Sequence, residues 1–211
     1  MTDDIKETIL LEALKEIPFA GFSDEALRAA ALSAGIDVSE MRKQFPRGGE
    51  SLVEFFSEWA DAKMRVQMAQ MPVLKMRERI AAGVRARIEV MTPHKESARR
   101  AAAFLALPQN APLAARLLFS TVDAIWRAAG DQTSDFNYYT KRALLAGVYG
   151  STLLYWLSDS SEDHADTWTF LDGRIGDVMK IQQARGSVER GLAQFPNPLS
   201  ILESLRSRRT P

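Results

Sequence analysis

The chain has 211 residues, with 27 basic and 27 acidic side chains and no cysteine. That length suits one sizeable core, or a small domain joined to a larger one. The balanced charge gives no overall attraction to nucleic acid, and the absence of cysteine excludes disulfides, thiolate nucleophiles and cysteine-based metal sites. The longest uncharged stretch, 143–158, is shorter than the roughly 20 apolar residues of a transmembrane helix. The N-terminal residues lack the pattern of a targeting signal, so we expect a soluble, cytoplasmic protein.

Helical periodicity dominates the chain, and no stretch has the alternation of a convincing strand. Pro18 is expected to end the first helix, while Ser23 can cap the second and Gly35 can stop it. Proline, glycine or polar clusters separate the later helices. The expected helices cover 5–17, 24–34, 38–45, 50–71, 73–91, 95–107, 111–129, 135–158 and 162–184, with one short helix after Pro198.

The first 60 residues resemble the helix–turn–helix module of tetracycline-repressor-like regulators. The matching segments are "ALKEIPFAGF", "LRAAALSAGI" and "MRKQFPRGGESL". Such a module places a short recognition helix in the DNA major groove, but here that helix carries Asp37 and Glu40. The pattern's usual Tyr and Lys phosphate contacts are replaced by Arg42 and Gly48.

The charge of this module opposes DNA binding. It holds 6 basic and 12 acidic residues, a net charge of −6, which leaves +6 for residues 61–211. Attraction to phosphates supplies most non-specific DNA affinity and requires positive charge on the binding module. We therefore expect a degenerate module and no nucleic-acid partner.

No group of residues has the spacing of a catalytic site. His164, in "SEDHAD", has carboxylates nearby, but no Glu-x-x-His pair and no second histidine at ligand spacing accompany it. We interpret this segment as a polar helix start capped by Ser161, with a metal site as the alternative. Glycine-rich phosphate loops and the G-x-S-x-G motif are absent. The sequence therefore predicts a non-enzyme without a metal.

Apolar and aromatic residues are in surplus in the helices expected over 95–129 and 135–158. Bundle interiors commonly host apolar ligand sites, so the surplus favours a lipid-binding pocket between helices. Core packing or a helical dimer interface is the alternative. Gly147 and Gly150 favour close approach by another helix or by a ligand. The candidate lipid-binding residues are Phe104, Leu105, Leu117, Leu118, Trp126, Tyr149, Leu153 and Trp156.

Three further segments are informative: "TVDAIWRAAGD" (121–131), "DFNYYTKR" (135–142) and "DTWTFLDGRI" (166–175). With them, most of residues 75–180 resembles the ubiquinone biosynthesis accessory protein family, the ninth Coq protein. The resemblance implies an all-α, tetracycline-repressor-like fold. We expect a degenerate helix–turn–helix domain over 1–60, a helical lipid-binding and dimerisation domain over 61–185, and a tail over 186–211.

The resemblance also implies a function. It predicts a non-catalytic protein that binds isoprenoid or quinone-precursor lipids and presents them to the di-iron demethoxyubiquinone hydroxylase. It would act peripherally, at the inner face of the cytoplasmic membrane. Apart from a bound isoprenoid, quinone precursor or phospholipid, no cofactor is expected. Repressor-like folds usually pair through their last two long helices, which predicts a homodimer. The alternatives are a ligand-responsive transcription regulator and a dimerisation scaffold with a solid core.

Three aromatic residues begin the helix expected over 135–158. With Phe136 at the origin of a helical wheel, Tyr138 and Tyr139 fall at about 200° and 300°, so the three rings cannot enter one core. In the family the Trp-Tyr pair of "DFNWYTKR" is the docking patch for the hydroxylase, and Tyr138 and Tyr139 occupy its positions. Tyrosine in place of tryptophan removes area and the indole donor, which puts the docking geometry in doubt. The alternative is that one tyrosine only fixes the preceding loop. The candidate partner-binding residues are Phe136, Asn137, Tyr138, Tyr139 and Arg142.

The tail has the pattern of a short amphipathic helix after Pro198. Its leucines lie three residues apart, and arginines cluster at its end, as suits anionic lipid headgroups. We expect this helix to contact a membrane surface, with a soluble disordered tail as the alternative. The candidate membrane-binding residues are Phe195, Leu199, Leu202, Leu205, Arg206, Arg208 and Arg209.

Overall fold

A computed structural model describes residues 2–72, 74–131 and 137–178, and these contain no strand. The chain divides into two compact units, Met1–Leu171 and Asp172–Pro211. The absence of strands from the described ranges and the helices below confirm the predicted all-α class. The helices of the first unit are α1 (Thr2–Ala20), α2 (Asp24–Ser33), α3 (Val38–Gln44), α4 (Gly49–Ala69), α5 (Met76–Met91), α6 (Lys95–Leu105), α7 (Ala111–Ala128) and α8 (Asn137–Ser158).

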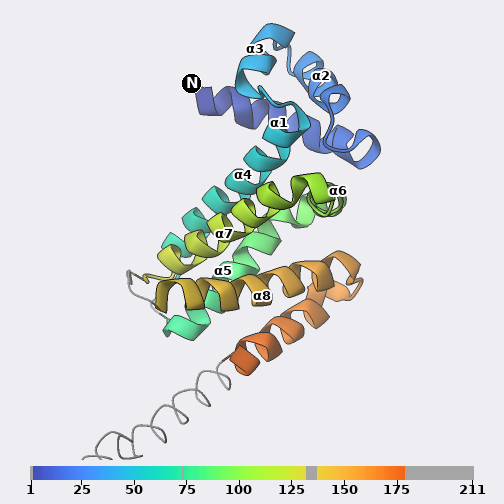
Figure 1. Cartoon of the computed structure of the whole chain (residues 1–211). Coiled ribbons are helices and arrows are strands. Elements are labelled where there is room, and N and C mark those ends of the chain that lie inside the picture. The colour runs from blue at the N-terminus through green and yellow to red at the C-terminus, as the bar shows by residue number, and fades with distance from the viewer. Residues whose placement is uncertain (1, 73, 132–136, 179–211) are drawn as a thin grey trace, which may run out of the picture. The chain divides into compact units, whose positions relative to one another are not determined.

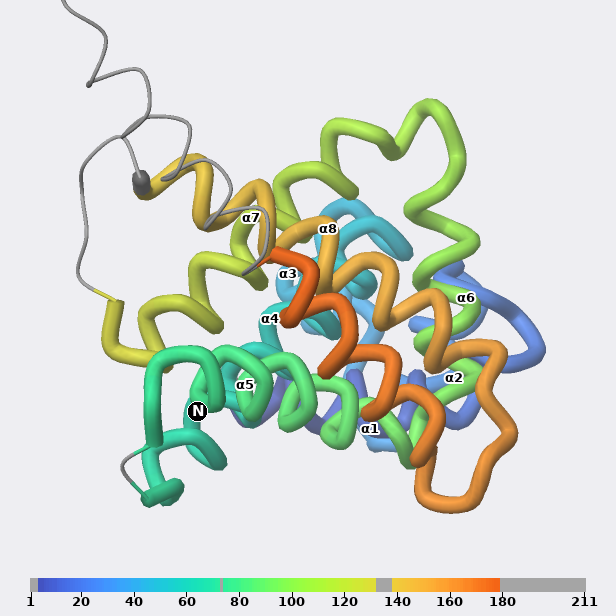
Figure 2. Tube along the Cα trace, turned by 90° about the horizontal axis from the view of Figure 1, so that it is seen from below, coloured from blue at the N-terminus to red at the C-terminus, as the bar shows by residue number. Residues whose placement is uncertain are grey.

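Figure 1 shows α1, α2 and α3 gathered at one end of the first unit, with α4 leading from them into the remaining helices. In the view from below, α5 and α7 flank α4 (Figure 2), and α8 packs against α7. The buried residues of α4 include a row that recurs every four positions along one face of the helix. The residues of this row are Leu52, Phe56, Ala60, Met64 and Met68. The long helix α4 therefore links the small helical module to the larger bundle.

The three-helix module has the predicted turn geometry. Ser23 caps α2 by accepting a hydrogen bond from the Ala26 amide at 3.2 Å, and Gly35 follows that helix with a φ of +66°. The carboxylate of Asp37 caps α3 by accepting from the Ser39 amide at 2.7 Å. Both caps satisfy helix amides that would otherwise lack a partner.

The prediction that Pro18 ends the first helix is wrong, because α1 continues to Ala20. Proline lacks an amide hydrogen, so it leaves the carbonyl four residues earlier, that of Leu14, without its helical partner. The Ser97 hydroxyl of α6 donates to that carbonyl at 3.0 Å. Gly21, with a φ of +65°, follows the helix and donates to the Ile17 carbonyl. A tertiary hydrogen bond therefore compensates for the proline.

The start of α4 requires a glycine. A Cβ atom on Gly49 would lie 2.0 Å from the Phe22 carbonyl oxygen, far inside van der Waals contact. The "PRGG" segment therefore permits a close backbone approach as well as a break between helices. The next helix, α5, begins three residues later than expected, where the Glu78 carboxylate accepts from the Lys75 amide at 3.0 Å.

The last described helix covers residues 165–178. The helix expected from 162 begins only at 165, after a 3-10 turn, Glu162–His164, to which the Ser161 side chain makes no cap bond. The Ser161 hydroxyl instead accepts from the Asp166 amide, in the first turn of the helix, at 3.1 Å. Burial raises the pKa of Asp159, but hydrogen bonds from Thr167 and Ser161 outweigh that effect and hold it well below its usual range. Within the second unit, Arg174 and Asp177 form an ion pair at 2.8 Å. No helix among the described residues is long and apolar enough to cross a bilayer.

Candidate functional site

Five helices of the first unit line a half-open cavity of about 380 Å³, which is within the usual range for ligand pockets. Its walls are mostly alanine, leucine and other apolar side chains from α4, α5, α6, α7 and α8. The smallest lining side chains are those of the alanines on α6 and of Gly150 on α8, and they leave space in the cavity. The apolar wall residues are Val53, Phe56, Met91, Ala98, Ala101, Ala102, Leu105, Ala114, Leu117, Leu118, Gly150, Leu153 and Leu154.

The structure brings together part of the predicted lipid-binding set. Five of its eight residues line the cavity, namely Leu105, Leu117, Leu118, Tyr149 and Leu153. Phe104 instead packs on Phe22, with ring centroids 6.3 Å apart. Trp156 is fully buried and meets His164 edge-on, and the Lys141 ammonium lies over the Trp126 ring. Phe104, Trp126 and Trp156 were predicted to line the cavity and do not. Their large rings fill space by packing against other residues, whereas small side chains leave space open.

The cavity also has polar lining residues, and of these the sequence analysis had named only Tyr149. Arg87 of α5 is buried, and its Nε donates to the Asp61 carboxylate of α4 at 2.6 Å. The hydroxyl of Thr121 donates to the same carboxylate at 3.2 Å, and the Arg87 guanidinium also donates to the Tyr149 hydroxyl. Burial raises the pKa of the Tyr149 phenol. Ser57, Arg87, Thr121 and Tyr149 all line the cavity.

A signal for this cluster was present in the sequence. Arg87 is at helical spacing from Ile80, Val84 and Met91, so it belongs to the apolar stripe of α5. Asp61 likewise lies on the buried face of α4. An acid and a base on the buried stripes of two neighbouring helices predict a buried ion pair, because neither charge is tolerated there alone.

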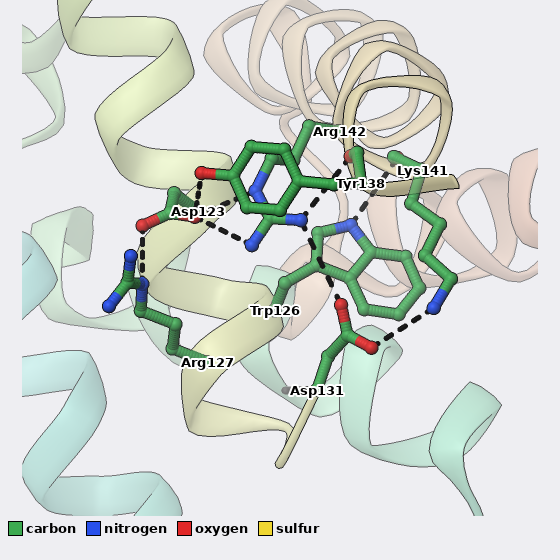
Figure 3. Close-up of polar contacts among 7 residues, drawn as sticks. All are labelled: Asp123, Trp126, Arg127, Asp131, Tyr138, Lys141 and Arg142. Carbon is green, nitrogen blue, oxygen red and sulfur yellow. Dashed lines mark hydrogen bonds and ion pairs between the residues drawn. The ribbon is translucent and has the colours of Figure 1, made fainter. Parts of the chain in front are cut away.

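A second cluster lies where α7 meets α8. Figure 3 shows the Asp123 carboxylate between Arg127, Arg142 and the Tyr138 hydroxyl, which donates to it at 2.9 Å. The Arg142 guanidinium lies 3.3 Å from the Tyr138 ring centroid and forms an ion pair with Asp123 at 2.6 Å. Burial raises the pKa of Asp123, but hydrogen bonds from Arg142, Tyr138 and Arg127 outweigh burial and lower it. The cluster holds Tyr138 in one orientation.

The exposed residue of the predicted partner-binding pair is Tyr139, whose side chain is 69% exposed. Its ring meets Tyr138 edge-on at 5.1 Å between centroids, and Tyr138 lies 6.3 Å from the ring of Phe119 on α7. Phe119 is 42% exposed and was not among the predicted residues. Its exposure could have been predicted, because Phe119 is two positions after the buried Leu117 and therefore points to the opposite side of the helix, about 200° away. We call Phe119, Tyr138 and Tyr139 the aromatic patch.

Arg142 differs from its predicted place beside an exposed interface, because it is only 2% exposed. It supports the patch from beneath through Tyr138 and cannot itself present a charge to a partner. Phe136 lies outside the described residues, as does the side chain of Asn137. The predicted membrane-binding residues, from Phe195 to Arg209, also lie outside them.

The fold and the cavity define a tetracycline-repressor-like helical protein with a half-open, mostly apolar pocket. Among solved structures, the chain is similar to a TetR transcriptional regulator from Nitrosomonas europaea, with a TM-score of 0.65 and 18% identity. That match covers 82% of this chain and 97% of the regulator, and it confirms the predicted fold.

The chain belongs to the COQ9 family. The family model matches residues 111–182, the region of α7, α8 and the helix that follows. The chain is 36% identical to "Ubiquinone biosynthesis protein COQ9, mitochondrial" of Rattus norvegicus, over 98% of this chain and 71% of the relative. It is 33% identical to the protein of that name from Homo sapiens, over 98% of this chain and 70% of the relative. The similarity therefore extends beyond residues 75–180, across the helix–turn–helix module as well.

Proposed function

We propose that the protein takes part in ubiquinone biosynthesis as a non-catalytic lipid carrier. It would bind an isoprenoid or quinone-precursor lipid in the cavity and present it to demethoxyubiquinone hydroxylase at a membrane surface. The cavity carries the proposal: its walls are apolar, five helices contribute to them, and a few polar groups converge at one end. That combination is typical of sites for small apolar ligands. Membership of the COQ9 family supports the choice of lipid.

The bound lipid can be tested with a variant that fills the cavity. Gly150 lines the cavity, and a Cβ atom there would meet nothing within 4 Å, so Gly150→Leu adds bulk without a clash at the backbone. Gly147 is equally open but does not line the cavity, which makes Gly147→Leu the matched control. Mass spectrometry of lipid extracted from the purified proteins should find an isoprenoid or quinone precursor in the wild type and in the control. Gly150→Leu should carry little, and a wild type without any lipid would refute the proposal.

The aromatic patch supports the second half of the proposal. Tyrosine, tryptophan and arginine carry much of the energy of protein interfaces, and three adjoining rings on a surface are a suitable anchor. We propose that the patch contacts the hydroxylase directly, while Arg142 and Asp123 fix the orientation of Tyr138. A pull-down with the purified hydroxylase tests this contact, and the patch variants are described below.

The membrane and homodimer predictions complete the proposal. We propose that the tail residues 195–211 attach the protein reversibly to anionic lipid at the inner face of the cytoplasmic membrane. In a flotation assay the full-length protein should rise with anionic vesicles, and the variant without these residues should not. The relatives named above are mitochondrial proteins, so fractionation of native cells should find the protein with whichever membrane carries the hydroxylase.

The proposed homodimer is tested separately. Light scattering at micromolar concentration should give twice the mass of the 23.5 kDa chain.

The helix–turn–helix module is proposed to have no DNA target. Its geometry matches that of a regulator, but its net charge is −6. The acidic Glu40 lies on α3, the helix that would enter the groove, and is bonded to Lys43 and Gln44 of the same helix. A gel-shift assay at physiological salt should find no specific complex. A specific complex would favour the transcription regulator instead.

A further inference from the structure

A second, smaller pocket lies in the helix–turn–helix module, between α2, α3 and the segment that leads into α4. Its volume is about 170 Å³. Pockets that hold drug-sized ligands begin at about 300 Å³, so this one has room for a single side chain or a group of that size. Its base is apolar, because Leu27 of α2, Met41 of α3 and Phe45 line it and are all buried. We call these three residues the apolar base.

Two arginines line the same pocket, one from each helix. Arg28 lies on α2 and Arg42 on α3, and both are exposed. Neither has an ion pair or a hydrogen bond with another residue that the structure describes. The other four basic residues of the module are engaged, three with a glutamate and one over an aromatic ring. They are Lys15, Lys43, Arg47 and Lys6. The two arginines at the pocket, which we call the arginine pair, are thus the ones left to bind an anion from outside.

The pocket also has a hydrogen-bond acceptor, the carboxylate of Asp24 on α2. It lies against Gly48, where a Cβ atom would be only 1.9 Å from the Asp24 Oδ1. Gly48 also has a φ of +56°, which favours glycine. No described residue donates a hydrogen bond to Asp24 or forms an ion pair with it. A ligand in this pocket therefore meets an apolar surface, two cations and one acceptor.

These groups together match the last residue of a polypeptide. An apolar side chain can pack on the apolar base, while the terminal carboxylate accepts hydrogen bonds from the arginine pair, whose planar guanidinium groups suit a carboxylate. The amide N–H of that residue can donate to Asp24. A phosphate or sulfate ion would leave the apolar base unused and would be repelled by Asp24. A polyanion would be repelled by the whole module, which has a net charge of −6.

We propose that this pocket binds the C-terminal residue of a partner protein, an apolar residue with a free carboxylate. Capture of a terminal carboxylate is a recurring mode of peptide recognition. The proposal gives the degenerate module a protein ligand in place of DNA, and it is independent of lipid binding in the larger cavity.

The test compares peptides that differ at the last residue. Isotope-labelled full-length protein is titrated by NMR with the acetylated tripeptide Ala-Ala-Leu, which has a free carboxylate. Amide signals of α2, α3 and residues 45–48 should shift. The same peptide with an amidated C-terminus should bind about tenfold more weakly, because it loses the charge that the two exposed arginines share. A peptide that ends in glycine should lose about fivefold or more, since it leaves the apolar base uncovered.

A double variant isolates the arginine pair. Arg28→Gln with Arg42→Gln should lower the affinity for the free-carboxylate peptide about tenfold, to that of the amidated peptide, and leave the amidated peptide unaffected. Lys15→Gln with Lys43→Gln is the matched control, because it changes the net charge of the module equally at two residues outside the pocket. Circular dichroism checks that both variants are folded. If the arginine variant unfolds, the peptide comparison on the wild type still decides.

Several results would overturn the inference. The absence of shifts in α2 and α3 at millimolar peptide would do so, as would equal affinity for the free and amidated peptides. Free leucine binding more tightly than the tripeptide would indicate an amino-acid site instead. Displacement of the peptide by an equal concentration of inorganic phosphate would indicate a general anion site. An equal loss in the lysine control would assign the effect to net charge. None of these results bears on the proposed lipid, which is measured separately by extraction.

Discussion

Two clusters of the same composition serve different ends in this molecule. In each, an arginine is buried, pairs with an aspartate of a neighbouring helix and contacts a tyrosine of α8. At the cavity, Arg87, Asp61 and Tyr149 are all buried. In the cluster beneath the aromatic patch, Arg142 is buried, Asp123 is 18% exposed, and Tyr138 adjoins the exposed Tyr139.

The difference between them lies in access to water. Asp123 shares its charge among two arginines and a phenol, and solvent can replace a lost partner. Asp61 has no such replacement, because burial leaves Arg87 and Thr121 as its polar partners among the described residues. The same three residue types therefore provide a buried, charge-balanced wall in one place and a partly exposed support for an aromatic ring in the other. Removing single members should reveal this contrast.

The largest expected effect is on stability, in the cavity cluster. Asp61→Ala leaves the buried Arg87 charge without its counter-ion, and breaking a buried pair in this way costs about 3–5 kcal/mol. Urea unfolding of the variant should give a free energy of unfolding lower by that amount. A loss below about 1 kcal/mol would mean that water in the cavity solvates Arg87, and the two clusters would then be equivalent.

The next largest effect is on partner binding, in the aromatic patch. Replacing Tyr138 and Tyr139 together with alanine should weaken binding to the hydroxylase by about 2–4 kcal/mol, while lipid content stays unchanged. Calorimetry or surface plasmon resonance would measure the affinity. Tyr155→Ala is the control, because it removes a partly exposed tyrosine of α8 outside the patch. A double variant that unfolds would show that the rings act chiefly in the core.

A smaller effect is expected for Asp123→Asn. The amide keeps the shape of the side chain but loses the charge that holds Arg142, while Asp131 remains 3.8 Å from that arginine. We expect a loss of about 1–2 kcal/mol in the free energy of unfolding, measured in urea, and weaker hydroxylase binding as Tyr138 loses its charged acceptor. If this variant lost as much stability as Asp61→Ala, exposure to water would not explain the difference between the clusters.

The smallest effect is a pH dependence. Since the folded-state pKa of Asp123 is lowered, its stabilising contribution is complete above the unfolded value of about 3.9 and is lost as pH falls through the folded value. Urea unfolding between pH 7 and pH 3 should therefore show a steeper loss of stability below about pH 4 in the wild type than in Asp123→Asn. Parallel curves would contradict a lowered pKa at this residue.

Sequence patterns alone determined most of the local structure. Apolar spacing and the Ser23 cap predicted most of the helices closely, because these signals act within one or two turns of the chain. The wheel argument predicted that Phe136, Tyr138 and Tyr139 cannot all enter one core; Tyr139 is exposed, and Phe136 lies outside the described residues. The predicted tail helix falls outside the described residues, so its structure stays a prediction.

Tertiary structure decided the rest, because contacts between helices depend on how they pack. Pro18 does not end α1, and the Ser97 hydroxyl, 83 residues from Leu14, donates to the Leu14 carbonyl in place of the missing amide. The polar end of the cavity joins Arg87 to Asp61 and Tyr149, 26 and 62 residues distant, and helical spacing cannot say which stripes will face each other. Periodicity fixes the face on which a side chain lies, whereas its partner depends on the packing of a second helix.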